Sequence, residues 1–142
     1  MDNAKELGLY FGLRRSEVTP FDIINLSRSG IKASFAKKLI RDIQINQEEF
    51  AEYLGLKIRT LSRRFEKPTE KMTSEESEKV IRLARIFLES LDIFKNEIKV
   101  ATWLKRPNRS LSDKAPISYL DSDIGAEEVM ALLGRIRDGV YS

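Results

Sequence analysis

Gly55 separates two short segments, residues 47–54 and 58–66, in which apolar residues recur on one helical face. The apolar residues are Phe50, Ala51 and Leu54 before the glycine, and Ile58, Leu61 and Phe65 after it. A glycine at the end of a short helix can adopt the left-handed conformation that turns the chain sharply. The spacing therefore predicts two short helices that meet at a tight corner and bury these six side chains.

Further helices are predicted on both sides of this corner. Start and stop signals place them at about residues 20–28, 31–43, 74–91, 95–104 and 125–137, with a short helical turn at 116–120. Thr73 and Glu76 have the spacing of a capping box, in which each side chain bonds the free backbone amide of the other. Residues 1–15 show no sustained apolar period, so we expect a loosely ordered arm there, with packing on a partner subunit as the alternative. With only 7 Gly and 4 Pro in 142 residues, the fold class is predicted to be all-α.

The absence of Cys and His removes most enzyme chemistry. Disulfides, Cys/His zinc sites and Ser-His-Asp or Cys-His pairs all require one of these residues. The 22 Asp and Glu residues leave carboxylate-only catalysis open, but they form no paired-carboxylate motif. We therefore predict a protein that is not an enzyme and has no catalytic residue, metal ligand or cofactor. A small carboxylate-dependent hydrolase is the alternative.

Basic residues are concentrated in one short part of the chain. Residues 57–71 hold six Lys or Arg and two Asp or Glu, whereas the formal net charge of the whole chain is only +3. A local basic patch on a near-neutral body indicates a polyanion that docks at one face. The alternative is a solvated, charged face of a helix.

The corner at Gly55 has the spacing of a helix-turn-helix. The small Ala51 lets two helices cross closely, and the second helix then protrudes into a major groove of DNA. The residues predicted to bind DNA are Gln47, Lys57, Arg59, Thr60, Ser62, Arg63 and Arg64. Among them Arg59, Ser62 and Arg63 suit base edges, and the others suit phosphates.

Three features of this prediction have alternatives. Lys57 occupies the position where a capping Ser or Thr is expected, so a phosphate could complete that helix start. Arg64 lies at the far end of the reading face, and its alternative is a salt bridge to Glu66 or Glu70, or exposure to solvent without a partner. The helix pair as a whole could be an αα-corner in a bundle, although the basic excess over residues 57–71 argues against this.

A second constellation lies in the C-terminal third of the chain. It comprises Trp103, Pro107, Asn108 and Pro116, then Gly125 to Ile136, and last Asp138-Gly139-Val140-Tyr141-Ser142. Together with the helix-turn-helix, from about residue 30 to the end, it resembles the Xre/MbcA/ParS-like antitoxins with a C-terminal toxin-binding domain, the partners of RES-domain toxins. One departure is Ser112-Asp113, where the family usually has Gly after the leucine of its central loop.

The resemblance implies an antitoxin of a type II toxin–antitoxin pair, which binds its operator DNA and neutralises a RES toxin that degrades NAD⁺. Its toxin-binding residues would be Gly134, Arg135, Gly139, Val140, Tyr141 and Ser142, with the tail entering the substrate cleft and occluding the active site. Trp103, Pro107, Asn108 and Pro116 would support the domain. From the residues alone, Tyr141 is either an aromatic anchor for a partner pocket or part of a frayed terminus.

The predicted organisation has three parts: an N-terminal arm and short helix at residues 1–28, a helix-turn-helix DNA-binding module at 29–92, and a small helical toxin-binding module at 93–142. A homodimer is expected, because one recognition helix rarely gives useful specificity, together with a hetero-oligomer with the toxin. No apolar run approaches the roughly 18 residues of a membrane span and no signal peptide is evident, which predicts a cytoplasmic protein without membrane contact. The chief alternative is a free-standing helix-turn-helix transcriptional regulator without a toxin partner.

Overall fold

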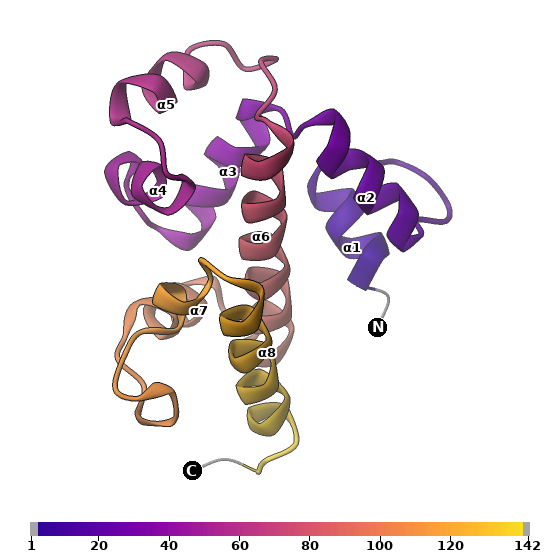
Figure 1. Cartoon of the computed structure of the whole chain (residues 1–142). Helices are drawn as coiled ribbons and strands as arrows, with labels where there is room; N and C mark the ends of the chain where they lie inside the picture. Colours follow the sequence, from indigo (N-terminus) through magenta and orange to yellow (C-terminus); the bar gives the residue numbers. More distant parts are fainter. Residues whose placement is uncertain (1–2, 141–142) are drawn as a thin grey trace. The chain divides into compact units, whose positions relative to one another are not determined.

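The computed structural model describes residues 3–140, which form eight α-helices, two short 3-10 helices and no β-strand (Figure 1). In chain order the elements are α1 (Asn3–Tyr10), α2 (Pro20–Ser29), α3 (Ala33–Ile43), α4 (Gln47–Leu54), α5 (Ile58–Phe65), α6 (Ser74–Phe94), α7 (Glu97–Lys105), η1 (Arg109–Leu111), η2 (Pro116–Tyr119) and α8 (Asp123–Arg137). The chain divides into two compact units between Ala84 and Arg85, so α6 contributes to both. The prediction of an all-α fold is confirmed.

The predicted corner between α4 and α5 is present in the first unit. Asn46 accepts a hydrogen bond from the backbone N–H of Glu49 (2.8 Å), and the Glu49 carboxylate accepts one from the Asn46 N–H (3.3 Å), so α4 begins with a capping box. Gly55 ends α4 in the left-handed conformation, with φ of 73°. The rings of Phe50 and Phe65 then stack with their centroids 6.4 Å apart, which joins α4 to α5 across the corner.

The buried face of α5 is shorter than predicted. Leu61 and Phe65 are buried, but Ile58 is 42% exposed. Helix α5 begins at Ile58, so this side chain lies at the protruding start of the helix, before the turn that packs on the core. The expectation that Ile58 is buried was therefore wrong, while the phase of the helix was right.

The N-terminal residues form a helix rather than the expected loosely ordered arm. Helix α1 contributes the buried side chain of Leu7, and Phe11 directly after it is also buried and packs edge-on against Phe35 of α3. The Tyr10 hydroxyl donates to the carboxylate of Asp42 in α3 at 2.6 Å. These contacts join residues 32 and 24 positions apart, so the local pattern of residues 1–15 could not reveal them.

Helix α2 begins where its sequence signals predicted. Thr19 and Asp22 form a capping box, and Pro20 occupies the first turn. The hydrogen bond from the backbone N–H of Thr19 lowers the pKa of the Asp22 carboxyl below its usual value, with help from the nearby Arg15 guanidinium.

The second unit packs α7, η2, α8 and the end of α6 around a small apolar core. The large side chains that are almost completely buried there are Ile86, Phe87, Leu104, Leu120 and Leu132. Trp103 of α7 packs against Phe94 at the end of α6, with ring centroids 5.6 Å apart. An ion pair between Glu89 of α6 and Arg137 of α8 joins the two helices, and Glu89 is 8% exposed.

Helix α8 begins at Asp123, two residues before the predicted start. Ser122 is its N-cap and accepts a hydrogen bond from the backbone N–H of Gly125 at 3.0 Å. Gly125 was the predicted first residue of this helix. The structure gives it another role, since a Cβ atom on Gly125 would lie 1.9 Å from the carbonyl oxygen of Tyr119.

The loop between α7 and η2 contains the departure from the family pattern. Ser112 and Asp113 both have positive φ, 58° and 61°, in the region that favours glycine. Asn108 holds this turn, because its backbone N–H donates to the Lys114 carbonyl (3.1 Å) and its carbonyl accepts from the Asp113 N–H (3.0 Å). This backbone conformation gives a physical reason for the glycine usually found in that loop.

Candidate functional site

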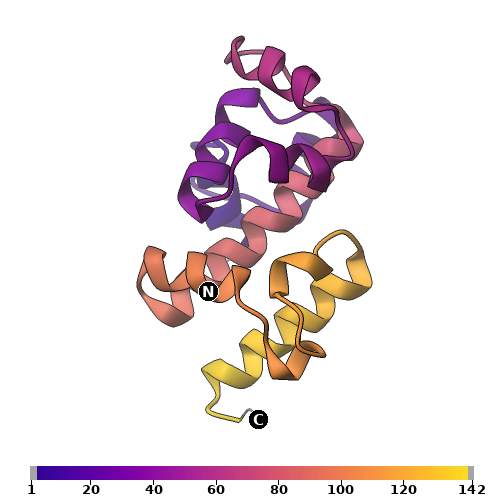
Figure 2. The same cartoon turned by 90° about the vertical axis from the view of Figure 1, so that its left-hand side faces the viewer.

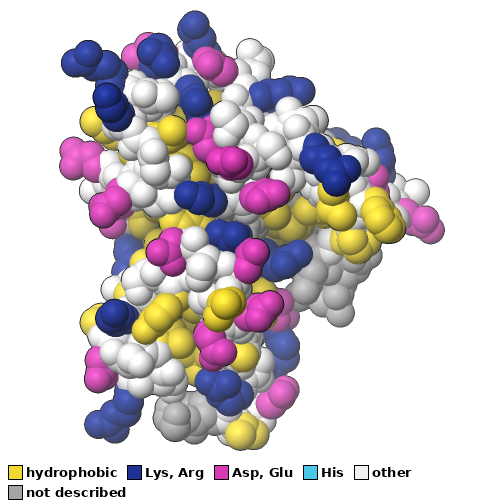
Figure 3. Space-filling model, in the orientation of Figure 1, with side chains coloured by type: hydrophobic (Ala, Val, Ile, Leu, Met, Phe, Trp, Pro, Cys, Tyr) yellow, Lys and Arg dark blue, Asp and Glu magenta, His cyan; other side chains and the backbone are white. Residues whose placement is uncertain are grey.

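The first candidate site is the outer face of α5 in the first unit. With Leu61 and Phe65 turned into the core, Lys57, Arg59 and Arg63 are exposed. Helix α5 lies at the outer edge of this unit in Figures 1 and 2. Figure 3 shows several Lys and Arg side chains gathered over α5 and the loop that follows it. The helix therefore presents a basic, protruding face to solvent.

Two predicted site residues from different helices are in direct contact. The Ser62 hydroxyl of α5 donates to the Gln47 side-chain oxygen of α4 at 3.1 Å, and both residues are half-buried. This bond orients the Gln47 carboxamide, whose nitrogen carries two hydrogen-bond donors of the kind that bind phosphate oxygens. Thr60 is also half-buried, one residue from Arg59.

The start of α5 has the unusual cap that its sequence indicated. Lys57 is the N-cap residue and makes no side-chain capping bond. Its backbone is extended, with φ of −71° and ψ of 141°, as is normal for an N-cap. The free N–H groups of a first helical turn attract anions, so the cation of Lys57 and these N–H groups favour the same kind of ligand.

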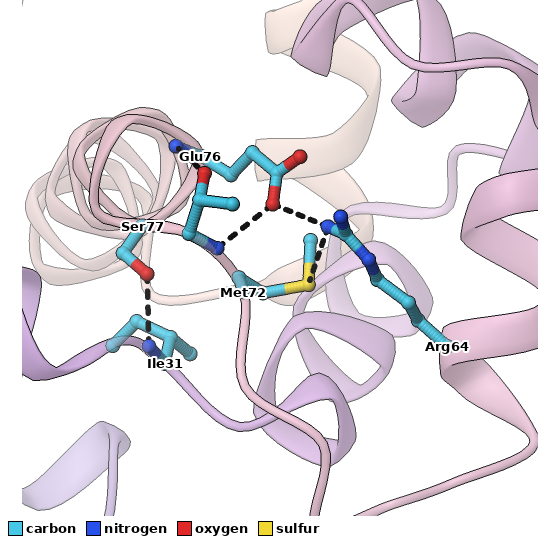
Figure 4. A network of polar contacts seen from close by, with 6 residues as sticks. Ile31, Arg64, Met72, Glu76 and Ser77 are labelled. Carbon is cyan, nitrogen blue, oxygen red and sulfur yellow. Dashed lines mark hydrogen bonds and ion pairs between the residues drawn. The ribbon is translucent and has the colours of Figure 1, made fainter.

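Arg64 differs from the other predicted DNA-binding residues in what it contacts. It forms an ion pair with Glu76 near the start of α6, and only 16% of the Arg64 side chain is exposed (Figure 4). The partner considered from the sequence was Glu66 or Glu70, and the structure has Glu76 instead. The loop after α5 brings α6 back beside Arg64, which adjacency in sequence could not indicate.

The second candidate site is the end of α8 in the second unit. Arg135 is exposed and Gly134 is half-buried. Gly139 has φ of 73°, and the helix closes with two hydrogen bonds, from the Gly139 N–H to the Ile136 carbonyl (3.1 Å) and from the Val140 N–H to the Arg135 carbonyl (2.8 Å). Val140 is 66% exposed. Tyr141 and Ser142 lie outside the described residues.

Gly134 has no structural explanation within its own unit. A Cβ atom built there would meet nothing within 4 Å outside the helix backbone. Glycine inside a helix is less favourable than alanine by about 1 kcal/mol. Alanine at this position would therefore make the folded chain more stable than glycine does.

Three of the four residues that the resemblance assigned to support, Trp103, Asn108 and Pro116, are part of the packing of the second unit. Pro116 is buried and starts η2, and the Asn108 side chain accepts a hydrogen bond from the Ser110 N–H at 2.9 Å. Trp103 is half-buried, whereas Pro107 is exposed at the end of α7. Sequence reasoning missed the hydroxyl of Tyr119, which donates to the Leu111 carbonyl at 2.7 Å and closes the loop onto η2.

Two further observations bear on what the molecule can bind. In the part of the chain that the structure describes, no group of three or more acidic residues is placed to hold a metal ion. Among the helices of residues 3–140, none combines the length and the apolar composition needed to cross a membrane.

Comparison with known proteins gives a match for each unit. Residues 22–85 match the Antitoxin Xre-like helix-turn-helix domain, and residues 91–139 match the Antitoxin Xre/MbcA/ParS C-terminal toxin-binding domain. The chain is 33% identical to an Antitoxin Xre of Photorhabdus laumondii over 114 residues, 80% of this chain and 76% of the relative. It is likewise 33% identical to an Antitoxin Xre of Yersinia enterocolitica over 117 residues, 79% of this chain and 78% of the relative.

A third relative carries a more specific name. The chain is 27% identical over 133 residues to a protein of a Sphingobium species named Prs ADP-ribosylating antitoxin, covering 87% of this chain and 83% of that protein. The outer face of α5 falls inside the first matched domain, and the end of α8 falls inside the second. The two candidate sites therefore lie in different domains of the same match.

Proposed function

This chain belongs to the Xre/MbcA/ParS family of antitoxins, which act by binding rather than by catalysis, and from this premise we propose that it neutralises a RES-type toxin and represses its own operator. The observation that carries the proposal is the separation of two exposed sites in two matched domains. One is a basic recognition face, and the other is a helix end that leads to the exposed Val140. A DNA partner and a protein partner could thus be held by the same chain.

Operator binding is assigned to α5 and the start of α4. Arg59, Ser62 and Arg63 are proposed to contact base edges in the major groove, since an Arg can bond both acceptors of a guanine. Gln47, Lys57 and Thr60 are proposed to contact phosphates, which fix the register of the helix on DNA. Two copies of the chain would bind a two-fold operator, so the DNA-bound form is proposed to be a homodimer.

Toxin neutralisation is assigned to the end of α8 and the tail. Gly134 and Arg135 lie on the last turns of the helix, and Gly139 and Val140 lead out of it. The tail residues Tyr141 and Ser142 are proposed to enter the substrate cleft of the toxin. A cleft that accepts NAD⁺ must accept flat aromatic rings, so a Tyr ring can occupy the same space and exclude the substrate.

The identity of the toxin is proposed from the same chemistry. RES toxins of this family degrade NAD⁺, and the relative from Sphingobium is named for ADP-ribosylation, a reaction that also consumes NAD⁺. The proposed partner is therefore a toxin with an NAD⁺ cleft, encoded by the neighbouring gene. Both proteins are proposed to act in the cytoplasm. A toxin that transfers ADP-ribose to a protein is the second candidate for the same antitoxin.

Co-expression with the product of the neighbouring gene tests the proposal. We expect the two proteins to co-purify as a hetero-oligomer and the toxin's consumption of NAD⁺ to fall when this chain is added. Labelled DNA from the chain's own promoter should bind more tightly than a scrambled duplex of the same length. Promoter binding without any toxin complex would instead establish a free-standing transcriptional regulator.

A further inference from the structure

The recognition helix depends on tertiary contacts for its orientation. Helix α5 has only 8 residues and makes no side-chain capping bond at its start. Helices shorter than about 12 residues are unstable on their own in water. The orientation of α5 therefore depends on the packing of its two buried side chains, Leu61 and Phe65, and on contacts made at its C-terminal end.

An ion pair between Arg64 and Glu76 provides such a contact at the C-terminal end of α5. The guanidinium of Arg64 pairs with the carboxylate of Glu76, 12 positions later in the chain, and lies 4.0 Å from the sulfur of Met72 (Figure 4). Side-chain exposure is 16% for Arg64 and 9% for Glu76, so both charges are largely removed from water. The same carboxylate oxygen accepts a hydrogen bond from the Thr73 N–H at 2.8 Å. One carboxylate oxygen of Glu76 thus caps α6 and also pairs with Arg64 of α5.

The start of α6 is itself a fixed point in the first unit. The Ser77 hydroxyl accepts a hydrogen bond from the backbone N–H of Ile31 at 2.8 Å (Figure 4). The Met72 N–H donates to the Ile31 carbonyl at 2.7 Å. Ser77 is completely buried. Met72 and Ser77 therefore bond Ile31, and Glu76 between them bonds Arg64. Glu76 is held rigidly enough to position its partner.

We propose that Arg64 is a positioning residue for DNA binding, which sets the orientation of α5 through Glu76 and does not itself contact DNA. The proposal rests on the proposed operator binding by α5. A contact from Arg64 to a phosphate would leave the Glu76 carboxylate buried without its cation, which is strongly unfavourable. Arg59 and Arg63 are exposed, and within residues 3–140 neither forms an ion pair like that of Arg64.

The variant Glu76→Gln distinguishes positioning from direct contact, because the two roles predict effects of opposite sign. Gln keeps an acceptor for the Thr73 N–H but removes the charge that holds Arg64. Positioning predicts that affinity for the promoter fragment falls about tenfold, within the range over which residues of one ion-pair network couple. Direct contact predicts equal or higher affinity, because the guanidinium is released and a negative charge near DNA is lost.

The matched control is Glu75→Gln, which removes the same charge from the adjacent, exposed position of the same helix. Its affinity for the promoter fragment should equal or slightly exceed that of the parent chain. If Glu76→Gln binds like Glu75→Gln, the positioning role is wrong. If the unmodified chain itself shows no preference for the promoter fragment over a scrambled duplex, the proposed function fails and not the role of Arg64.

A second variant covers the case in which Glu76→Gln does not fold. Arg64→Met with Glu76→Gln replaces the ion pair by neutral side chains of similar length, an exchange that buried pairs often tolerate. The measurement is the slope of log affinity against log salt concentration. Positioning predicts an unchanged slope, since no phosphate contact is lost. A slope reduced by about one would show that Arg64 neutralises a phosphate and would overturn the proposal.

Discussion

Gly125 and Gly134 lie in the same helix, but lack of space for a side chain accounts for glycine only at position 125. A Cβ atom on Gly125 would lie 1.9 Å from the backbone carbonyl oxygen of Tyr119, so this glycine lets η2 approach the first turn of α8. A Cβ atom on Gly134 would meet nothing within 4 Å. No contact in the second unit therefore requires glycine at position 134, and the proposed function supplies one reason for it, close approach of the toxin backbone.

Substituting Gly134→Ala should separate stability from toxin binding. Removing a glycine from the interior of a helix should raise the free energy of unfolding by about 0.5–1 kcal/mol. If the toxin approaches the backbone at this position, the added methyl group should lower toxin affinity at the same time. Thermal unfolding of the purified chain and titration with the toxin measure the two effects.

Gly125→Ala is the control for this experiment. It should destabilise the second unit, because a backbone carbonyl has to move to admit the methyl group. A Gly134→Ala variant that is more stable and binds the toxin as tightly as the parent would remove position 134 from the toxin interface.

At the level of the element, the start of α5 combines a weak cap with a proposed ligand contact. Lys57→Ser should supply the missing capping hydroxyl and stabilise the first unit by about 0.5–1 kcal/mol. The same change removes a cation from the proposed phosphate site, so DNA affinity should fall and the salt slope should decrease by about one. Chemical denaturation and a salt series of the promoter-binding assay measure these effects. Unchanged DNA affinity in the more stable variant would leave Lys57 without a role in DNA binding.

Elements with strong local signals could be predicted from the sequence. Helix start signals located the beginnings of α2 and α4, where the structure has capping boxes, and the predicted Thr73–Glu76 box located the start of α6. Helix α1 could not be predicted, because its residues are ordered by contacts with α3 that are distant in sequence. Local patterns encode caps and helix phase, whereas docking of a short helix depends on a surface formed by other parts of the chain.

In the candidate site on α5, too, some features could be predicted from the sequence and others depend on the fold. The phase of α5 follows from Leu61 and Phe65, so the exposure of Arg59 and Arg63 was predictable. The pairing of Arg64 with Glu76 was not, because it depends on the path of the loop between α5 and α6. Glu76 was recognised as a cap from the sequence, and only the fold reveals its second role.

At the scale of the whole molecule, the two proposed activities belong to different compact units. The double variant Arg59→Ala/Arg63→Ala alters only exposed side chains of the first unit. Operator affinity should fall by roughly 1–3 kcal/mol for each Arg that pairs with a guanine. Protection of cells from the toxin should persist, because the second unit is unchanged. Promoter binding and survival during toxin induction measure the two outcomes, and loss of protection by a folded double variant would contradict the division of labour.

The tail can be tested without disturbing the helix that precedes it. The two hydrogen bonds that close α8 end at the N–H groups of Gly139 and Val140, so a chain that stops after Val140 keeps both. This truncation should leave helix content and operator binding unchanged. Some toxin complex should remain through α8, but inhibition of NAD⁺ consumption should weaken by about tenfold or more, the loss typical when an aromatic anchor is removed.

A bulky tag placed after Ser142 provides the complementary change. A tail that must enter a narrow cleft should inhibit less well when it is extended, whereas a tail on the outside of the complex should tolerate the tag. Because substrate and tail would share the cleft, raising the NAD⁺ concentration should also relieve inhibition by the full chain. Blocking must come from another surface if the truncated chain inhibits as well as the full chain, and Tyr141 and Ser142 would then lose the roles proposed for them.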